Sequence, residues 1–185
     1  MKNMTKNTQV TVRGTLSYAK IWEPDPETKK YSCALLVDKD DVDSLDKIAG
    51  ALNAAIEAGK TKLANQKGNV VKATLKLPLR DGDDEHPGEK TYENKMFFNC
   101  SSKRKIPVVD RHRVAITDTE EVYSGCIVNA VINLYAFNTG GNKGIAVGIN
   151  AIQKVRDGER LGGGSVDINK AFEDMGDDDD DDFLN

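Results

Sequence analysis

Few of the side chains that catalytic and metal sites require are present in this 185-residue chain. It has two histidines, and its three cysteines lie far apart without a CxxC pair, which argues against a zinc site and a disulfide framework. The GxSxG, Walker and HExxH motifs are missing. His86 stands beside acids in segment 81–88, but the spacing fits no metal-ligand motif and favours a solvated loop. We therefore expect no enzyme activity, no metal and no cofactor.

Long hydrophobic runs are missing as well. No apolar stretch approaches the roughly 18 residues that a membrane span needs, and the polar start of the chain lacks the apolar core of a signal peptide. The separated cysteines fit small core residues in a reducing compartment. These features predict a cytoplasmic protein with no membrane contact.

Charge is distributed unevenly along the chain. Residues 171–185 contain eight acids and no Lys or Arg, so residues 1–170 carry a net charge of +4, which is −4 for the whole chain minus −8. A basic body followed by an acidic tail is typical of a nucleic-acid-binding protein with regulated affinity, because the acids compete with the nucleic acid for the basic residues. The alternative is a purely solubilising tail. The apolar ending favours a tail that docks on a protein partner. The residues predicted for that contact are Asp177, Asp178, Asp179, Asp180, Asp181, Asp182 and Phe183.

Hydrophobic periodicity predicts many strands and one long helix. Alternation marks strands over residues 10–18, 31–37, 71–77, 92–100, 127–137 and 145–155, whereas residues 42–56 follow helical spacing. Gly14 in the first strand suggests a bulge or a sharp coil. Because the strands do not alternate with helices, we expect a mostly β protein, a small antiparallel barrel with an inserted amphipathic helix. The expected organisation is one domain over residues 1–168 and a flexible acidic tail over residues 169–185.

Basic residues cluster over residues 103–113, and aromatic residues lie before and after this cluster in the sequence. A loop dense in cations can follow a phosphate backbone, and exposed rings can stack with bases of any sequence. The strand over residues 127–137 has one apolar face and one face of amides and aromatics, and the second face can meet a ligand. Ordinary core and surface roles remain the alternative for each residue taken singly. The predicted phosphate contacts are Lys103, Arg104, Lys105, Arg111, Arg113, Lys143 and Lys154, and the predicted stacking residues are Trp22, Phe97, Tyr135 and Phe137.

Several segments together resemble a known family. Residues 122–126, 133–138, 141–146 and 153–163, with the similar stretch 105–110, look like those of phage single-stranded DNA-binding proteins once catalogued as a domain of unknown function. That family is similar to the podovirus single-stranded DNA-binding protein. In this chain two residues follow Phe183, whereas the related tails carry an aromatic residue at or near the end.

The resemblance implies both a fold and a role. The fold is one oligonucleotide-binding (OB) barrel with an elaborated helix and an acidic C-terminal tail. The role is sequence-independent binding of single-stranded DNA in phage replication and recombination, in the host cell cytoplasm. The tail would contact phage or host replication proteins and cover the groove when DNA is absent. Pairing of barrel edges leaves a homodimer open.

A different class of function explains the tail equally well. A phage structural or scaffolding adaptor could use the acidic tail to hold a basic protein partner and never contact DNA. That hypothesis leaves the basic loop at residues 103–113 without a role.

Overall fold

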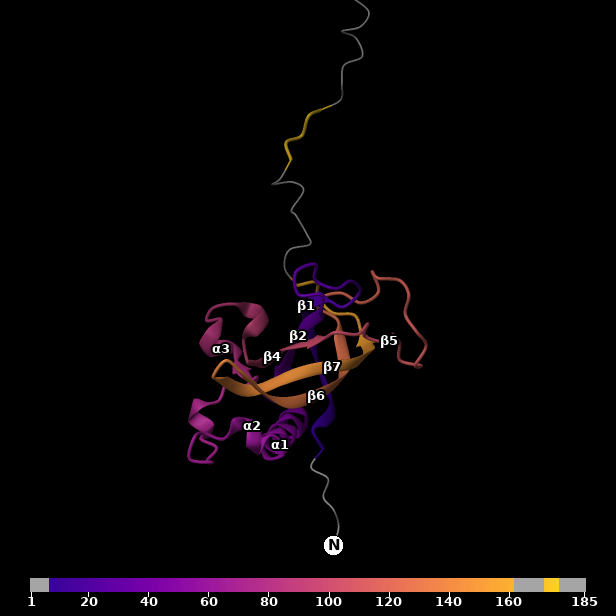
Figure 1. The fold of residues 1–185 in the computed structure, drawn as a ribbon. Helices are drawn as coiled ribbons and strands as arrows, with labels where there is room; N and C mark the ends of the chain where they lie inside the picture. Colours follow the sequence, from indigo (N-terminus) through magenta and orange to yellow (C-terminus); the bar gives the residue numbers. More distant parts are fainter. Residues whose placement is uncertain (1–6, 162–171, 177–185) are drawn as a thin grey trace, which may run out of the picture.

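Five long strands close into a barrel (Figure 1) in the computed structural model, which describes residues 7–161 and 172–176. They are β1 (Gln9–Lys20), β2 (Tyr31–Asp38), β4 (Lys95–Ser102), β6 (Ile127–Thr139) and β7 (Asn142–Arg156). β1 pairs antiparallel with β6 through its first half and with β2 through its second half, β2 pairs with β4, and β6 pairs with β7. A parallel pairing of Ser101 with Gly148 closes the barrel between β4 and β7. The predicted mostly β, OB-type barrel is thus confirmed.

One long helix and several short elements occupy the connections between barrel strands. They are α1 (Val42–Ala58), α2 (Lys60–Leu63), η1 (Lys72–Thr74), β3 (Arg80–Asp81), α3 (Gly82–Glu85), η2 (Lys90–Tyr92) and β5 (Val108–Val109). β3 pairs with β4 and β5 pairs with β7. In Figure 1, α1 and α2 lie together across one end of the barrel.

The helix α1 begins where the sequence predicted. The Asp41 carboxylate accepts a hydrogen bond from the Ser44 N–H at 3.1 Å, which satisfies one of the free donors of the first turn. Ile48, Ala51 and Ala55 are buried against the barrel, at the helical spacing of an amphipathic face. The helix therefore closes the barrel end rather than shaping a ligand site.

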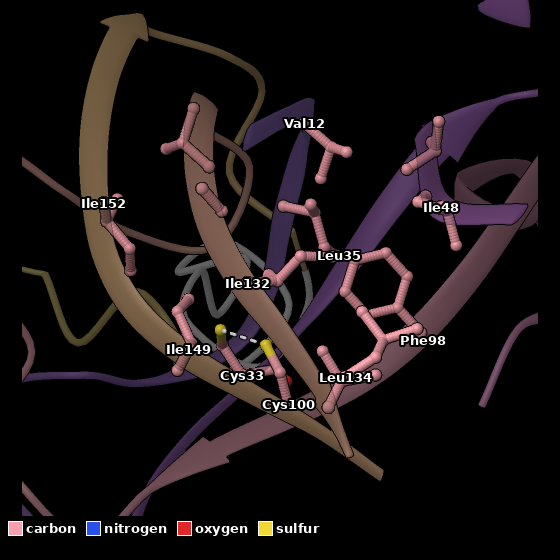
Figure 2. Close-up of a cluster of buried hydrophobic side chains, with 14 of the residues drawn as sticks. Val12, Cys33, Leu35, Ile48, Phe98, Cys100, Ile132, Leu134, Ile149 and Ile152 are labelled. Carbon is pink, nitrogen blue, oxygen red and sulfur yellow. Dashed lines mark hydrogen bonds between the residues drawn. The ribbon is translucent and has the colours of Figure 1, made fainter. Parts of the chain in front are cut away.

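The barrel interior is packed with side chains from all five strands (Figure 2). Of the predicted apolar face of β6, Val128, Ala130, Ile132 and Leu134 are each at most 1% exposed, and Ala136 is partly buried against the same core. They meet buried residues of the other four strands in a single core cluster. Because the interior is filled, a ligand has access only to the outer surface.

One predicted strand is wrong. Residues 71–77 do not form a strand: they contain the short helix η1, and only Lys76 makes a bridge, to Gly144 of β7. Of the four residues on the predicted apolar face, only Leu75 is buried, while Val71 is 43% and Leu77 is 42% exposed. The alternation was too short to bury a full face, and Pro78 prevents further ladder pairing.

The predicted solvated loop at residues 81–88 is also more ordered than expected. It contains α3, and the Asp81 carboxylate accepts a hydrogen bond from the Asp83 N–H at 2.9 Å. The Lys39 ammonium lies 2.8 Å from Asp81 and 2.6 Å from Asp83, and it lowers the pKa of both carboxyls. The His86 ring stacks on Tyr92 with centroids 3.9 Å apart. These contacts anchor the segment to the barrel.

Within residues 7–161 and 172–176, no helix has the length and apolar character needed to cross a membrane. The same residues contain no group of three or more potential metal ligands. The predicted tail contacts, Asp177 to Phe183, lie outside the described residues.

Candidate nucleic-acid interface

An open cavity of about 760 Å³ lies on the outside of the barrel, where β2, β4 and β7 approach one another. We call it the groove. It is lined by Tyr18 of β1, residues 32–33 of β2, 99–101 of β4, 145–147 of β7, and residues 76–78 and 80. In OB folds the corresponding outer face of the second and third strands binds oligonucleotides. The cavity is thus in the position where this fold carries its ligands.

One wall of the groove is formed by residues 76–78 and 80, which include the end of the segment predicted as a strand. The Lys76 N–H donates to the Lys143 carbonyl at 2.9 Å, and the Ile145 N–H donates to the Lys76 carbonyl at 3.0 Å. A Cβ on Gly144 would lie 2.2 Å from the Lys76 carbonyl oxygen, so the close approach requires glycine. Further along, Arg80 pairs with Phe97 of β4. The segment therefore crosses from β7 to β4 and bounds the groove on both strands.

The residues that line the groove carry a net positive charge. Lys76 and Arg80 are exposed cations, and the lining contains no acid. The Arg80 guanidinium lies 2.9 Å from Glu85, outside the groove lining, and 5.7 Å from the centroid of the Phe97 ring. These contacts hold the side chain of Arg80 while leaving half of it exposed. Two cations without a lining carboxylate favour an anionic ligand such as a phosphate backbone.

Tyr18 projects from the end of the groove. Tyr18 has the same parity as the buried Val12 and Leu16, so alternation over residues 10–18 predicts that it faces the core. The β1–β2 register shifts between Ser17 and Lys20, however, so Ser17 is buried and Tyr18 is 68% exposed. Its φ of 46° lies in the left-handed region, which is costly for a large side chain. Bulges commonly redirect a side chain beside a functional site. Tyr18 was missed because a register shift leaves no mark in the alternation.

Tyr92 is a neighbour of Tyr18, and the two residues line a common pocket. Burial first, and then the interaction with Tyr18, raises the pKa of Tyr92 to about 12. Tyr92 is packed between His86 and Phe97, with ring centroids 3.9 and 5.3 Å away. The tyrosine at the end of the groove is therefore a neighbour of a packed aromatic cluster.

Comparison with known proteins identifies the family of this barrel. Residues 5–184 match the family described as "Enterobacter phage Enc34, ssDNA-binding protein". The chain belongs to that family. The predicted resemblance to phage single-stranded DNA-binding proteins is thus confirmed, as is the prediction of a binding protein rather than an enzyme.

Individual proteins and solved structures are also similar to this chain. Protein p50 of Acyrthosiphon pisum secondary endosymbiont phage 1 is 27% identical over 168 residues, which are 86% of this chain and 89% of that protein. The single-stranded DNA-binding protein of bacteriophage Enc34 in complex with ssDNA has 23% identity and a TM-score of 0.67, over 84% of this chain and 90% of that one. The single-stranded DNA-binding protein gp2.5 of bacteriophage T7 has 16% identity and a TM-score of 0.59, over 90% and 97%. These structures share the fold.

The predicted stacking residues of this Enc34-family chain fall in different environments. Tyr135 is 44% exposed and pairs with Ala146, which lines the groove. Its ring lies next to Gly148, since a Cβ there would be 3.7 Å from Tyr135 Cε1. Phe97, in contrast, is 4% exposed and packs beneath Tyr92. The structure thus leaves Tyr135 exposed, opposite a residue of the groove lining, and buries Phe97.

Trp22 and Phe137 lie away from the groove lining. Trp22 is half-buried against the core, and its indole N–H donates to the Val122 carbonyl at 3.2 Å. It lines a separate hollow that contains three carboxylates and two cations, so the local charge favours phosphate less than in the groove. Phe137 is half-buried near the end of β6, opposite Gly144.

The predicted basic loop divides into two parts. Lys103, Arg104 and Lys105 are exposed and follow directly on the last residue of β4, so they begin two positions beyond Ser101 of the groove. Arg111 and Arg113 are exposed in a tight turn after β5. That turn is held by the Asp110 carboxylate, which accepts hydrogen bonds from the N–H groups of residues 112 and 114 and therefore has a lowered pKa. Figure 1 shows the connection after β5 standing away from the barrel.

Lys143 and Lys154 make hydrogen bonds within the fold. The Lys143 ammonium donates to the Ala64 carbonyl at 2.7 Å. The Lys154 ammonium donates to the Glu121 carbonyl at 2.6 Å and lies 2.6 Å from the Asp157 carboxylate, with 18% of its side chain exposed. Neither lines the groove. Their positions fit a structural role better than a phosphate contact.

Amide side chains on the mixed face of β6 form hydrogen bonds within the protein. Asn129 Nδ2 donates to Gln153 Oε1 at 3.1 Å, Gln153 Nε2 donates to the Asp110 carbonyl at 3.3 Å, and Arg13 Nε donates to Asn129 Oδ1 at 3.1 Å. This network ties four segments together on the outer face. No residue of the mixed face that the sequence singled out is part of the groove lining, but Tyr135 lies opposite Ala146, which is.

Proposed function

We propose that this chain binds single-stranded DNA in the groove, without sequence specificity, during phage replication and recombination in the host cell cytoplasm. The observation that carries the proposal is the groove itself, with cations Lys76 and Arg80 in its lining and an outward tyrosine at its end. Its place on the barrel is the ligand face of this fold. The Enc34 relative with the same fold is named as a complex with ssDNA, which supports the same ligand here.

In the proposed binding mode, phosphates contact Lys76 and Arg80 and continue towards the basic residues 103–105. Bases stack on Tyr18 and Tyr135, and stacking on a ring accepts every base because each has a π-face. Single strands are favoured over duplex because only unpaired bases can present that face to a protein side chain. Arg111 and Arg113 provide further phosphate contacts beyond the end of β4.

The acidic tail supplies regulation in this proposal. Residues 1–168 form the DNA-binding domain, and residues 169–185 form a tail whose carboxylates compete with phosphates for the groove cations. The same acids and Phe183 recruit replication proteins of the phage or host. The support for both roles is the charge division of the sequence, with eight acids and no cation after Lys170.

A binding titration tests the proposal. Fluorescence anisotropy of a labelled single strand of roughly 30 nucleotides, and of the matching duplex, is measured with the full chain and with a chain ending at Lys170, at two salt concentrations. We expect preferential binding of the single strand, weakened by salt. Equal affinity for both nucleic acids would refute single-strand selectivity. No binding by either chain would refute the function and leave the adaptor hypothesis.

A further inference from the structure

Two thiols face each other directly across neighbouring barrel strands. Cys33 of β2 pairs with Cys100 of β4, and their Sγ atoms are 3.4 Å apart (Figure 2). Both are free cysteines. Opposite residues in an antiparallel pair have Cα atoms about 4.5–5.5 Å apart, within the separation of about 4.4–6.8 Å that a disulfide spans. The backbone therefore already holds the two residues at a distance that a disulfide can bridge.

The sequence alone did not suggest this pair. The cysteines are 67 positions apart and form no CxxC motif, so they read as separate core residues. The β2–β4 register brings them together. Both residues are also part of the groove lining, so a change at this pair acts on two strands that line the groove.

We propose that Cys33 and Cys100 are a reversible modification site, at which a hydroperoxide converts the two thiols into a cross-strand disulfide. One thiolate attacks a peroxide oxygen, the O–O bond breaks, and a sulfenic acid and one water form. The second thiol attacks the sulfenic sulfur, the S–O bond breaks, and a second water leaves. Two thiols and one hydrogen peroxide thus yield one disulfide and two waters, and a dithiol reductant reverses the change.

Burial makes this reaction depend on local opening. Both residues are 3% exposed, and hydrogen bonding to Cys33 together with burial raises the pKa of the Cys100 thiol. Cys100 precedes Ser101, whose pairing with Gly148 is the single register pair that joins β4 to β7. This seam is the shortest ladder in the closed barrel, so it is the place where a local opening costs least. Such an opening exposes the Cys100 thiol to a small oxidant.

The third cysteine provides an internal control. Cys126 is fully buried, and its Sγ lies 3.5 Å from the Tyr123 N–H donor and 3.7 Å from the Glu121 carbonyl. Among residues 7–161 and 172–176, the Cys126 thiol forms no hydrogen bond with another cysteine. The proposal therefore assigns the disulfide to one specific pair.

The predicted consequence is a stabilised barrel. A disulfide that closes a loop of 67 positions restricts the unfolded chain. For a protein of this size we expect a rise in Tm of roughly 10 °C, less any strain from bringing the sulfurs together. Because the proposal concerns the thiols and not the ligand of the groove, a failure to bind DNA leaves it intact.

The test treats the full chain with hydrogen peroxide and measures intact mass, a non-reducing peptide map and Tm. We expect a mass loss of two hydrogen atoms, a peptide that joins Cys33 to Cys100, a higher Tm, and reversal of all three by dithiothreitol. Cys126→Ser should behave in the same way, and Cys33→Ser should show no mass loss of this kind.

Three results would overturn the proposal: an unchanged mass after prolonged treatment, oxygen addition to the thiols without a cross-link, or a cross-link that involves Cys126. If Cys33→Ser does not fold, the peptide map of Cys126→Ser alone decides, because that variant retains only the proposed pair.

Discussion

Replacing Tyr18 by alanine should weaken binding of single-stranded DNA while leaving the barrel folded. The ring is 68% exposed at the end of the groove, and the register shift in β1 turns it outward. Little apolar surface is lost on truncation, so the cost in stability is small. The φ of 46° remains after substitution by alanine, so the backbone geometry of the bulge is tested separately by Tyr18→Gly, which accommodates that φ without a Cβ.

The size of the effect follows from stacking energetics. One base stacked on an aromatic ring contributes about 1–3 kcal/mol, and each 1.4 kcal/mol corresponds to roughly a tenfold change in affinity. Tyr18→Ala should therefore raise Kd by roughly 5- to 150-fold. Tyr18→Phe keeps the ring and loses only the hydroxyl, so its affinity should stay near that of the parent.

The assay is anisotropy of a labelled oligonucleotide, with circular dichroism and Tm as checks on folding. A folded Tyr18→Ala protein that binds as tightly as the parent would refute the stacking role. So would Tyr18→Phe binding as weakly as Tyr18→Ala, because the hydroxyl and not the ring would then be responsible.

Three further predictions concern charge. Arg80→Gln should reduce the magnitude of the slope of log K against log salt by about 0.7, the value for one phosphate contact on a single strand. Lys47→Gln on α1, outside the groove, should leave the slope unchanged, and equal slopes for both variants would rule out the contact. Deleting residues 171–185 should tighten binding at low salt and less at high salt, and a weaker or unchanged affinity in the low-salt titration would exclude autoinhibition. Lys39→Met removes the ammonium that lowers the pKa of two carboxyls at α3. A carboxyl with a lowered pKa in the folded state stabilises the protein at pH values above its unfolded-state pKa, and this stabilisation is lost as the pH falls through the folded-state pKa. The variant should therefore be less stable than the parent in urea at pH 7 and equally stable once both carboxyls are protonated. A difference in stability that persists at acid pH would contradict this linkage.

The barrel was predictable because alternation of apolar residues along a strand indicates which of its faces is buried in the core. Val128, Ala130, Ile132 and Leu134, which share one parity in β6, are all buried, and the helical spacing after Asp41 gave α1 with its acidic cap. Tyr135 was predictable on the same basis, as an aromatic on the outward parity of a strand. Each of these predictions needed only neighbouring residues.

The rest of the site depended on contacts that neighbouring residues do not encode. Segment 71–77 alternates like a strand, but it lies as a wall against Gly144 because β7 offers it one pairing position. Phe97 looks like a free aromatic, but the fold places Tyr92 and His86 over it. Lys143 and Lys154 look like free cations in the sequence, but in the fold their ammonium groups donate hydrogen bonds to carbonyls of distant segments.

By itself the sequence determined the class of fold, the charge division between body and tail, and the family, because composition, periodicity and local motifs carry that information. Only the tertiary structure decided which side chains form the groove and which thiols meet. Tyr18, Lys76, Arg80 and the Cys33–Cys100 pair come from strands and connections far apart in the chain. Their proximity is set by strand register and by a bulge in β1, and register follows from how all five strands close around one core.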